Sequence, residues 1–484
     1  MEKLGDHKQT QGQLHDGGVT SDSDGYNKHE ASSSHDGHDF QTVNESADNS
    51  NIYSQGGKNF RTLKRWDTIF ILFANQIGLG ILSLPSTLKT LGLVPGIIAL
   101  IGIGGISWYT AYELLQYYRL HPQVLNIVDM TRFVGGRTLE SIAGIMMMIQ
   151  VIFVAASAMV TLSIALNTIS DHAACTVVFI FISCAACFLF CLPRTTKFVS
   201  HLGIPNALSV LAACIIVMVV LGVDGPRGVD NMSEWRREIV IVGNPSFRDG
   251  LNACLKIVFA YAANLSFVGY LAEMTAPLED FKFCLTVLEC GSMTMYVVFA
   301  VIFYCLGAEY TTSPILGSTA PIFSKAAYGV ALPAIFATGL AYGHIGSKYI
   351  FVNVMRWTGN LHEVTASSVK SWGTWIASVT GFWVVVFILS NAIPVFDSIL
   401  SITSATTISW FTYGFSAVFW FHMNKGQYFR DWKKICLTIV NALLIIMSLF
   451  MNAAGLWASI TELLDIFNSS SGVRGVFSCG DNAS

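Results

Sequence analysis

The segment from Asn75 to Pro85 combines polar side chains, two glycines and a proline inside an apolar run of roughly residues 67–90. That run is long enough to cross a bilayer, which requires about 20 apolar residues. Glycine and proline suit a helix that opens and presents unpaired backbone N–H and C=O groups. At membrane depth such groups must be buried in protein or line a cavity. The segment therefore predicts a discontinuous helix that binds a substrate and a coupling ion, with a helix-packing motif as the alternative.

A second apolar run, roughly residues 249–275, is interrupted at mid-depth by the small and polar residues 260–270. The two interrupted runs are the first and the sixth along the chain, and we expect them to cross the membrane in opposite senses. This arrangement predicts two five-helix repeats of inverted topology, each opening with a discontinuous helix. The inference is positional, because the two halves show no clear residue-level repeat.

Two such openings suit an amino acid. The half-helix that starts near Gly80 offers N–H groups and a positive dipole end to a carboxylate. Carbonyl groups of the opened sixth run suit an ammonium group. Neither opening contains an acidic or basic residue, which favours a substrate with a neutral side chain. The predicted substrate-binding residues are Asn75, Ile77, Gly78, Gly80, Tyr261, Asn264, Ser266 and Phe267.

The elements that must position these residues are eleven apolar runs of spanning length. They cover roughly residues 67–90, 93–118, 139–169, 174–192, 198–222, 249–275, 285–307, 326–357, 371–391, 393–421 and 433–461. Most Lys and Arg residues of the short loops fall on one side if the N-terminus is cytoplasmic, which predicts that orientation. We predict an all-α integral membrane fold with 11 transmembrane helices.

Composition bounds the rest of the chain. Only 12% of the residues are charged and 53% are hydrophobic, with a net charge of −3. Residues 1–57 are polar and acidic, and we predict a disordered cytoplasmic tail. We expect residues 58–464 to form a transporter domain and residues 465–484 a short extracytoplasmic tail. Sequons that could carry glycans on the outer side are at Asn231, Asn468 and Asn482.

Other classes of function find little support. The loops hold no nucleophile motif, phosphate loop or metal cluster, so we expect no enzyme activity, cofactor, metal site or nucleic-acid partner. Cys184, Cys187 and Cys191 have a metal-like spacing but lie in an apolar run, where a packing role is the better interpretation. Cys175 and Cys479 both fall on the predicted outer side, and a disulfide between them is possible but not indicated by the sequence.

From about Leu63 to Leu464 the chain resembles the amino acid/auxin permease (AAAP) family, especially its fungal neutral amino acid permeases. The motifs that carry the resemblance are residues 75–85, Gly92-Leu93-Val94-Pro95-Gly96, Ala272-Glu273-Met274 with Pro277, Tyr304-Cys305-Leu306-Gly307 and Ser313-Pro314-Ile315-Leu316-Gly317. The resemblance implies secondary active transport by a LeuT-type 5+5 inverted repeat plus one extra helix, and fungal members are generally proton-coupled.

Ionisable residues inside spans are costly and often functional. His344 and Lys348 are four residues apart in the eighth run and share a helix face with Ser347 nearby. In sodium-coupled relatives of this architecture, uncharged groups of the first and eighth spans bind the ion. An ammonium here could replace sodium, so we predict coupling to protons rather than sodium. The alternative is that Lys348 extends toward the cytoplasm.

Further charges fall near the predicted ends of spans. We interpret Lys256 as extending outward from the start of the sixth run. A possible inner gate consists of Arg65, Glu113 and Glu273; Glu289 is assigned to the same cytoplasmic end, and ordinary interfacial charges are the alternative.

The function predicted is proton symport of neutral amino acids by alternating access, in the plasma membrane. The alternatives are an amino acid sensor with transporter architecture, a sodium-coupled symporter, and a vacuolar location. The sequence leaves the exact substrate open.

Overall fold

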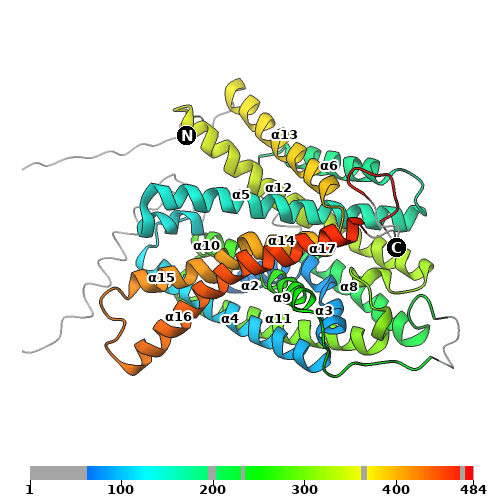
Figure 1. The fold of residues 1–484 in the computed structure, drawn as a ribbon. Helices are drawn as coiled ribbons and strands as arrows, with labels where there is room; N and C mark the ends of the chain where they lie inside the picture. Colours follow the sequence, from blue (N-terminus) through cyan, green and yellow to red (C-terminus); the bar gives the residue numbers. More distant parts are fainter. Residues whose placement is uncertain are drawn as a thin grey trace, which may run out of the picture. The chain divides into compact units, whose positions relative to one another are not determined.

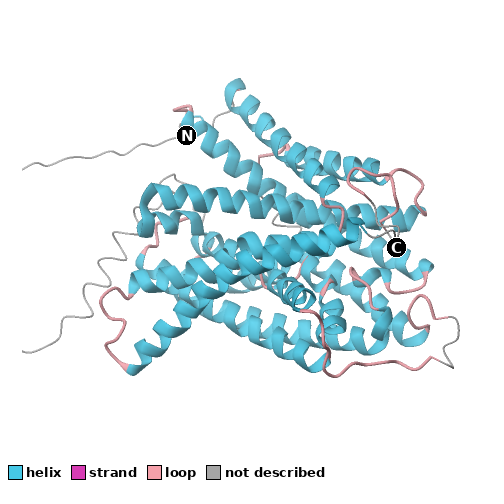
Figure 2. Ribbon diagram, viewed as in Figure 1, coloured by secondary structure: helices cyan, strands magenta, loops and turns pink. Residues whose placement is uncertain are grey.

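The computed structural model describes residues 61, 63–194, 203–229, 235–360, 363, 368–468 and 475–482. Every regular element within these ranges is a helix (Figure 2), apart from a single parallel bridge between Leu63 and Met274. The predicted all-α fold is confirmed for this part of the chain. The predicted tail of residues 1–57 and the sequon at Asn231 lie outside the described residues.

The helices follow one another as labelled in Figure 1. Their bounds are α2 Arg65–Gln76, η1 Leu79–Leu82, α3 Leu84–Leu91, α4 Leu93–Leu120, α5 Ile127–Ser170, α6 Thr176–Cys191, α8 Gly203–Val223, α9 Phe247–Ala260, α10 Asn264–Glu273, α11 Pro277–Gly307, η2 Ala308–Tyr310, η3 Ile315–Gly317, α12 Pro321–Trp357, α13 Val369–Ala392, α14 Phe396–Thr403, η5 Ser404–Gly414, α15 Phe415–Met423, α16 Trp432–Phe450, η6 Met451–Gly455 and α17 Leu456–Asn468.

Local sequence explains several helix ends. The Asn126 side chain accepts a hydrogen bond from the Asp129 N–H at 2.9 Å and so caps α5. Ser246 caps α9 in the same way. α11 and α12 each begin with a proline, whose missing N–H is not needed at a first helical position. Gly136, with φ of 63°, makes a kink near the start of α5 that few other residues would accept.

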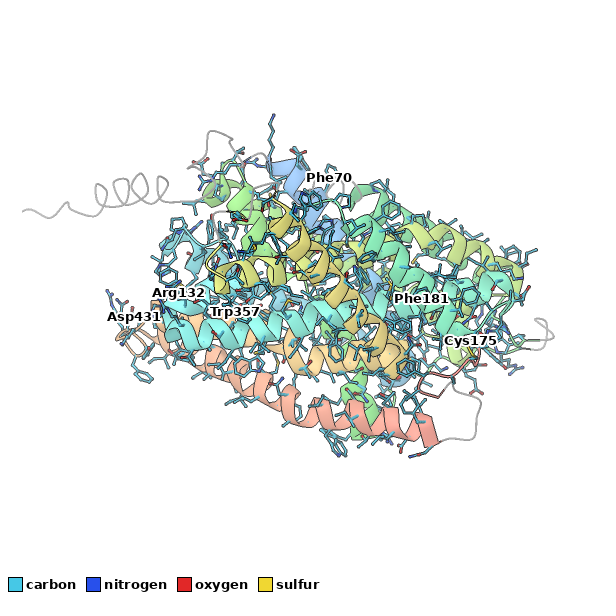
Figure 3. The ribbon with its side chains drawn as sticks, turned by 90° about the horizontal axis from the view of Figure 1, so that it is seen from above. Phe70, Arg132, Cys175, Phe181, Trp357 and Asp431 are labelled. Atoms are coloured by element: carbon cyan, nitrogen blue, oxygen red, sulfur yellow. A yellow bond between two sulfur atoms is a disulfide. The ribbon has the colours of Figure 1, made fainter. Side chains whose placement is uncertain are left out.

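Eight helices of the described chain are long and apolar enough to cross a membrane. The remaining predicted runs correspond to a helix of 16 residues, α6, and to helices divided into pieces: α2–η1–α3 and α14–η5–α15. The count of eleven spans therefore stays a prediction. Large apolar side chains such as Phe70 and Phe181 are 50% and 60% exposed and project from the surface in Figure 3, as expected of a lipid-facing bundle.

The interrupted helices lie at the centre of the bundle. In the apolar 18-residue stretch of α9 and α10, 72% is buried inside the protein, and in that of α5 67% is buried. In the corresponding stretch of α16 and α17 only 22% is buried. α3 packs against α9, and α2 packs against α8 and α11. Figure 1 shows α2 and α9 between α5 on one side and α4 and α11 on the other. The fold thus surrounds both broken helices with long continuous ones.

One end of the bundle is closed by a disulfide between Cys175 and Cys479. Beside it the Asn482 side chain donates to Ser163 Oγ at 2.9 Å and accepts from the Asn167 amide at 2.6 Å. Arg132 and Asp431 lie at the opposite end from Cys175 in Figure 3. The pairing of the two cysteines, which the sequence did not indicate, anchors residues 475–482 to the α5–α6 connection.

Candidate functional site

The first helix opens where the glycines predicted it. The Ile77 N–H donates to the Phe73 carbonyl at 2.8 Å and ends α2, and Gly78 takes a non-helical conformation with φ −123° and ψ −136°. η1 then begins at Leu79. The first N–H groups of a helix have no intrahelical acceptor, so Leu79 and Gly80 present backbone donors beside the break.

The second opening lies between α9 and α10. The turn consists of Tyr261, Ala262 and Ala263, and the N–H groups of Tyr261 and Ala262 donate to the carbonyls of Val258 and Phe259, each at 3.2 Å. Helical pairing resumes only at Asn264. Both predicted discontinuous helices are therefore present.

The two openings touch each other. A Cβ built on Gly80 would lie only 2.7 Å from the Ala260 Cα, so only glycine permits this approach. The Tyr296 hydroxyl of α11 lies 2.8 Å from the Gln76 carbonyl and 2.9 Å from the Ala260 carbonyl. Tyr296 therefore joins the last turn of α2 to the last turn of α9, with no charged group involved.

A small cavity of about 30 Å³ lies between these openings and the long helices α5 and α12. That volume is room for a water molecule and less than an amino acid needs. The residues that line it are Asn75, Gln76, Gly78, Leu79, Gly80, Val154, Phe259, Ala260, Ala262, Ala263, Thr338 and Tyr342. None of these twelve residues carries a formal charge. The arrangement offers backbone N–H groups, amides and hydroxyls to a polar guest.

Three of the predicted binding residues line the cavity directly: Asn75, Gly78 and Gly80. Ser266 lies just behind, because its Oγ accepts a hydrogen bond from the Asn75 amide at 2.7 Å and donates to the Ala263 carbonyl at 2.8 Å. The hydrogen bond between Asn75 and Ser266 therefore joins the two predicted segments beside the cavity.

The other four predicted residues face the surrounding protein instead. The Tyr261 hydroxyl donates to the Leu100 carbonyl at 3.2 Å, and the Asn264 amide donates to Thr110 Oγ1 at 3.2 Å and to the Thr412 carbonyl at 3.3 Å. Ile77 and Phe267 are buried in the apolar core. These residues fix the shape of the openings in this structure and do not line the cavity.

Sequence reasoning missed part of the lining. Gln76 directly follows Asn75 and is a second polar residue in the same apolar run. Thr338 and Tyr342 are four residues apart on α12, a spacing that indicates one shared polar helix face. Val154 of α5 carries no signal that separates it from other core residues.

The predicted coupling residues lie further along α12. His344 is 3% exposed and its Nδ1 has no partner among the described residues. Ser347 is fully buried, and its Oγ is likewise unpaired. Lys348 is exposed and interacts electrostatically with Glu273. The structure thus brings Lys348 near one predicted gate residue, while none of the three lines the cavity.

The predicted gate residues are not in contact as a set. Arg65 forms an ion pair with Asp280 of α11, a partner that the sequence did not suggest. Glu113 is 6% exposed and hydrogen-bonds with Tyr109. Glu273 is exposed at the end of α10. Each therefore belongs to a separate local contact in this arrangement.

The interpretation of Lys256 as an outward-extending side chain is wrong. Lys256 is 7% exposed, and its Nζ donates to Asp397 Oδ2 of α14 at 2.5 Å. Ser313 Oγ donates to the other carboxylate oxygen of Asp397 at 2.5 Å. Burial is tolerated because the charge is paired and hydrogen-bonded. This cluster lies one turn before the end of α9.

Comparison with known proteins agrees with the helical architecture. Residues 61–461 match the sequence model of a family described as transmembrane amino acid transporter protein. The N amino acid transport system protein of Neurospora crassa is 30% identical over 405 residues, which cover 82% of this chain and 84% of that protein. A transmembrane transporter of Gibberella moniliformis is 26% identical over 431 residues, covering 88% and 89% of the two chains.

Among solved structures, a manganese transporter of Eremococcus coleocola superposes with a TM-score of 0.50 at 12% identity, covering 85% of this chain and 93% of that one. The similarity concerns the fold alone.

Proposed function

Because the chain belongs to the transmembrane amino acid transporter protein family, we propose that it is a secondary active transporter that moves neutral amino acids by proton symport. The observation that carries the neutral specificity is the cavity, whose twelve lining residues include no acid or base. A charged substrate side chain would lose its hydration there without gaining a counter-charge.

The substrate's backbone groups find complementary partners at the two openings. Its carboxylate fits the N–H groups of Leu79 and Gly80 and the positive end of the η1–α3 half-helix. Its ammonium group fits carbonyl oxygens of the turn after Ala260. Asn75 and Ser266, joined at 2.7 Å, add hydrogen bonds, while Ile77, Tyr261, Asn264 and Phe267 hold the openings in shape.

Transport then requires the small cavity to open to each side in turn. We expect eleven spans arranged as a LeuT-type 5+5 inverted repeat plus one helix, with a cytoplasmic N-terminus and residence in the plasma membrane. The Cys175–Cys479 disulfide supports an extracytoplasmic C-terminus, because disulfides persist in oxidising compartments. The sensor alternative gains no support from the names of the relatives.

The choice of protons as the coupling ion is supported by two residues of α12. A cation at Lys348 next to the buried His344 would repel sodium, which favours protons as the driving ion. On this view the Lys348–Glu273 interaction belongs to an inner gate that changes during the cycle.

The test is accumulation of a labelled neutral amino acid in proteoliposomes with pH and sodium gradients imposed separately. We expect accumulation with a pH gradient alone, and loss of accumulation with retained exchange in Lys348→Ala. Accumulation driven by sodium at equal pH on both sides would overturn proton coupling. Wild-type accumulation by Lys348→Ala would overturn only the role of that residue.

A further inference from the structure

We propose that the carboxyl group of Glu289, behind the wall of the cavity, is the site that binds the transported proton. The inference rests on the proposed proton symport and supplies the proton site that the α12 residues leave open.

Glu289 lies deep in the bundle, and its assignment to the cytoplasmic end of a span is wrong. It is 1% exposed. It is the thirteenth residue of α11, which begins at Pro277, so about 18 Å of helix precede it at 1.5 Å per residue. α11 packs against α2 and α4 there. An ionisable residue at such depth is a functional candidate by default.

The immediate neighbour of Glu289 is Gln76, the last residue of α2. The Gln76 side chain lies close enough to affect the Glu289 carboxyl, and its amide donates to Ser292 Oγ at 2.8 Å. Gln76 also lines the cavity. A single amide therefore connects the carboxyl group to the space where the substrate binds.

The other titratable groups facing Glu289 are phenols: Tyr261 in the α9–α10 turn, Tyr296 on α11 and Tyr413 in η5. α4 contributes the Ser107 hydroxyl, which lies 3.4 Å from the Tyr413 hydroxyl. No Lys or Arg of the described residues interacts electrostatically with the carboxyl. A fixed counter-charge, the usual reason for a permanently ionised buried carboxylate, is therefore missing from this part of the chain.

Two acceptor atoms at this place have no donor in the described structure: Oε2 of Glu289 and Oε1 of Gln76. Unpaired buried acceptors are costly. One proton on Glu289 supplies the donor that this pair lacks, because the acid O–H can donate to the Gln76 oxygen. Without the proton, the Gln76 NH₂ can donate to the carboxylate. By a flip of its side-chain amide, Gln76 can therefore hydrogen-bond with Glu289 in both the protonated and the ionised state.

The chemical step is a reversible protonation. A proton from water on one side forms the O–H bond of Glu289, and the same bond breaks to water on the other side, so one positive charge crosses with each neutral substrate. The rotation of Gln76 at the end of α2 links this step to the shape of the cavity. The backbone carbonyl of Gln76 also accepts a hydrogen bond from the Tyr296 hydroxyl. A shift of α2 therefore changes the surroundings of Glu289 directly.

The test uses the full-length protein in proteoliposomes and compares the wild type with Glu289→Gln and with the matched control Glu140→Gln. Glu140 pairs with Arg132 at 3.7 Å, away from the cavity. We expect Glu289→Gln to lose at least tenfold in accumulation driven by a pH gradient, to retain exchange at equal pH, and to exchange at a rate independent of pH. The control should accumulate as the wild type does.

The outcomes separate the two proposals. A wild type that shows no pH-driven accumulation refutes proton symport, and the proton site with it. A wild type that is proton-driven together with a Glu289→Gln variant of equal accumulation overturns only the assignment of Glu289. If Glu289→Gln does not reach the membrane, Glu289→Asp keeps a carboxyl one methylene shorter. We then expect accumulation with a shifted pH midpoint, and an unchanged midpoint overturns the proposal.

Discussion

Replacing Gly80 with alanine should strongly reduce transport by forcing the two broken helices apart. The added Cβ would lie 2.7 Å from the Ala260 Cα, 3.0 Å from its Cβ and 3.2 Å from its backbone N. Two of these are backbone atoms, which cannot rotate away. Overpacking of this kind costs about 1–3 kcal/mol. If this cost destabilises the conformation in which the two openings touch, the population of that conformation decreases about 5- to 150-fold relative to the other conformations.

The assay is initial uptake of a labelled neutral amino acid, divided by the amount of protein in the membrane. Gly105→Ala is the matched control, because a Cβ on that helical glycine meets nothing within 4 Å. Substitutions at Gly78 distinguish the effect of close packing from the effect of filling the cavity. Its Cβ also meets nothing within 4 Å, so alanine should be milder there than at Gly80, while leucine should block the cavity it lines.

We also expect a limited rescue by a second substitution. Ala260→Gly removes the 3.0 Å contact with a Gly80→Ala side chain and leaves the 2.7 Å contact with the backbone, so the double variant should recover only part of the uptake. Wild-type uptake by a normally expressed Gly80→Ala variant would refute the requirement for close approach.

Two further predictions concern stability. Asp397→Asn leaves Lys256 buried without its counter-charge; since the Asp397 side chain is 23% exposed, we expect a loss of about 2 kcal/mol, below the usual cost of breaking a fully buried pair. The thermal midpoint should recover when Lys256→Gln is added, and equal midpoints for single and double variants would contradict the pairing. Replacing Cys175 and Cys479 with serine should lower the free energy of unfolding by about 2–4 kcal/mol with uptake per folded molecule unchanged. Reductant should then destabilise the wild type and not the double variant; equal sensitivity of both proteins would count against the disulfide.

The sequence predicted the helix breaks because their cause is local. Gly78, Gly80 and the polar residues after Ala260 interrupt apolar runs, and that interruption is visible without any tertiary information. The all-helical architecture follows from apolar runs of spanning length for the same reason. What lines the cavity between the breaks depends on how α5 and α12 pack, and Val154 could not be selected from its own segment.

Charged residues were harder to place. The partners Lys256 and Asp397 are 141 residues apart, so no helix-face argument joins them. The apolar run that contains Glu289 begins at about residue 285, which places the residue near a span end, whereas α11 already begins at Pro277. The polarity of Asn264 and Tyr261 favours a role in binding substrate, yet in this structure their side chains hydrogen-bond to the protein that surrounds the openings.

The hydroxyl of Tyr296 has one hydrogen and two carbonyl acceptors, those of Gln76 and Ala260, at nearly equal distance. It can donate fully to only one at any instant. If α2 and α9 move apart, the hydrogen stays with one carbonyl while water from the widening cavity can bind the other. Each of the two carbonyls then keeps a donor along the motion. The two broken helices can therefore separate without leaving either buried carbonyl unpaired.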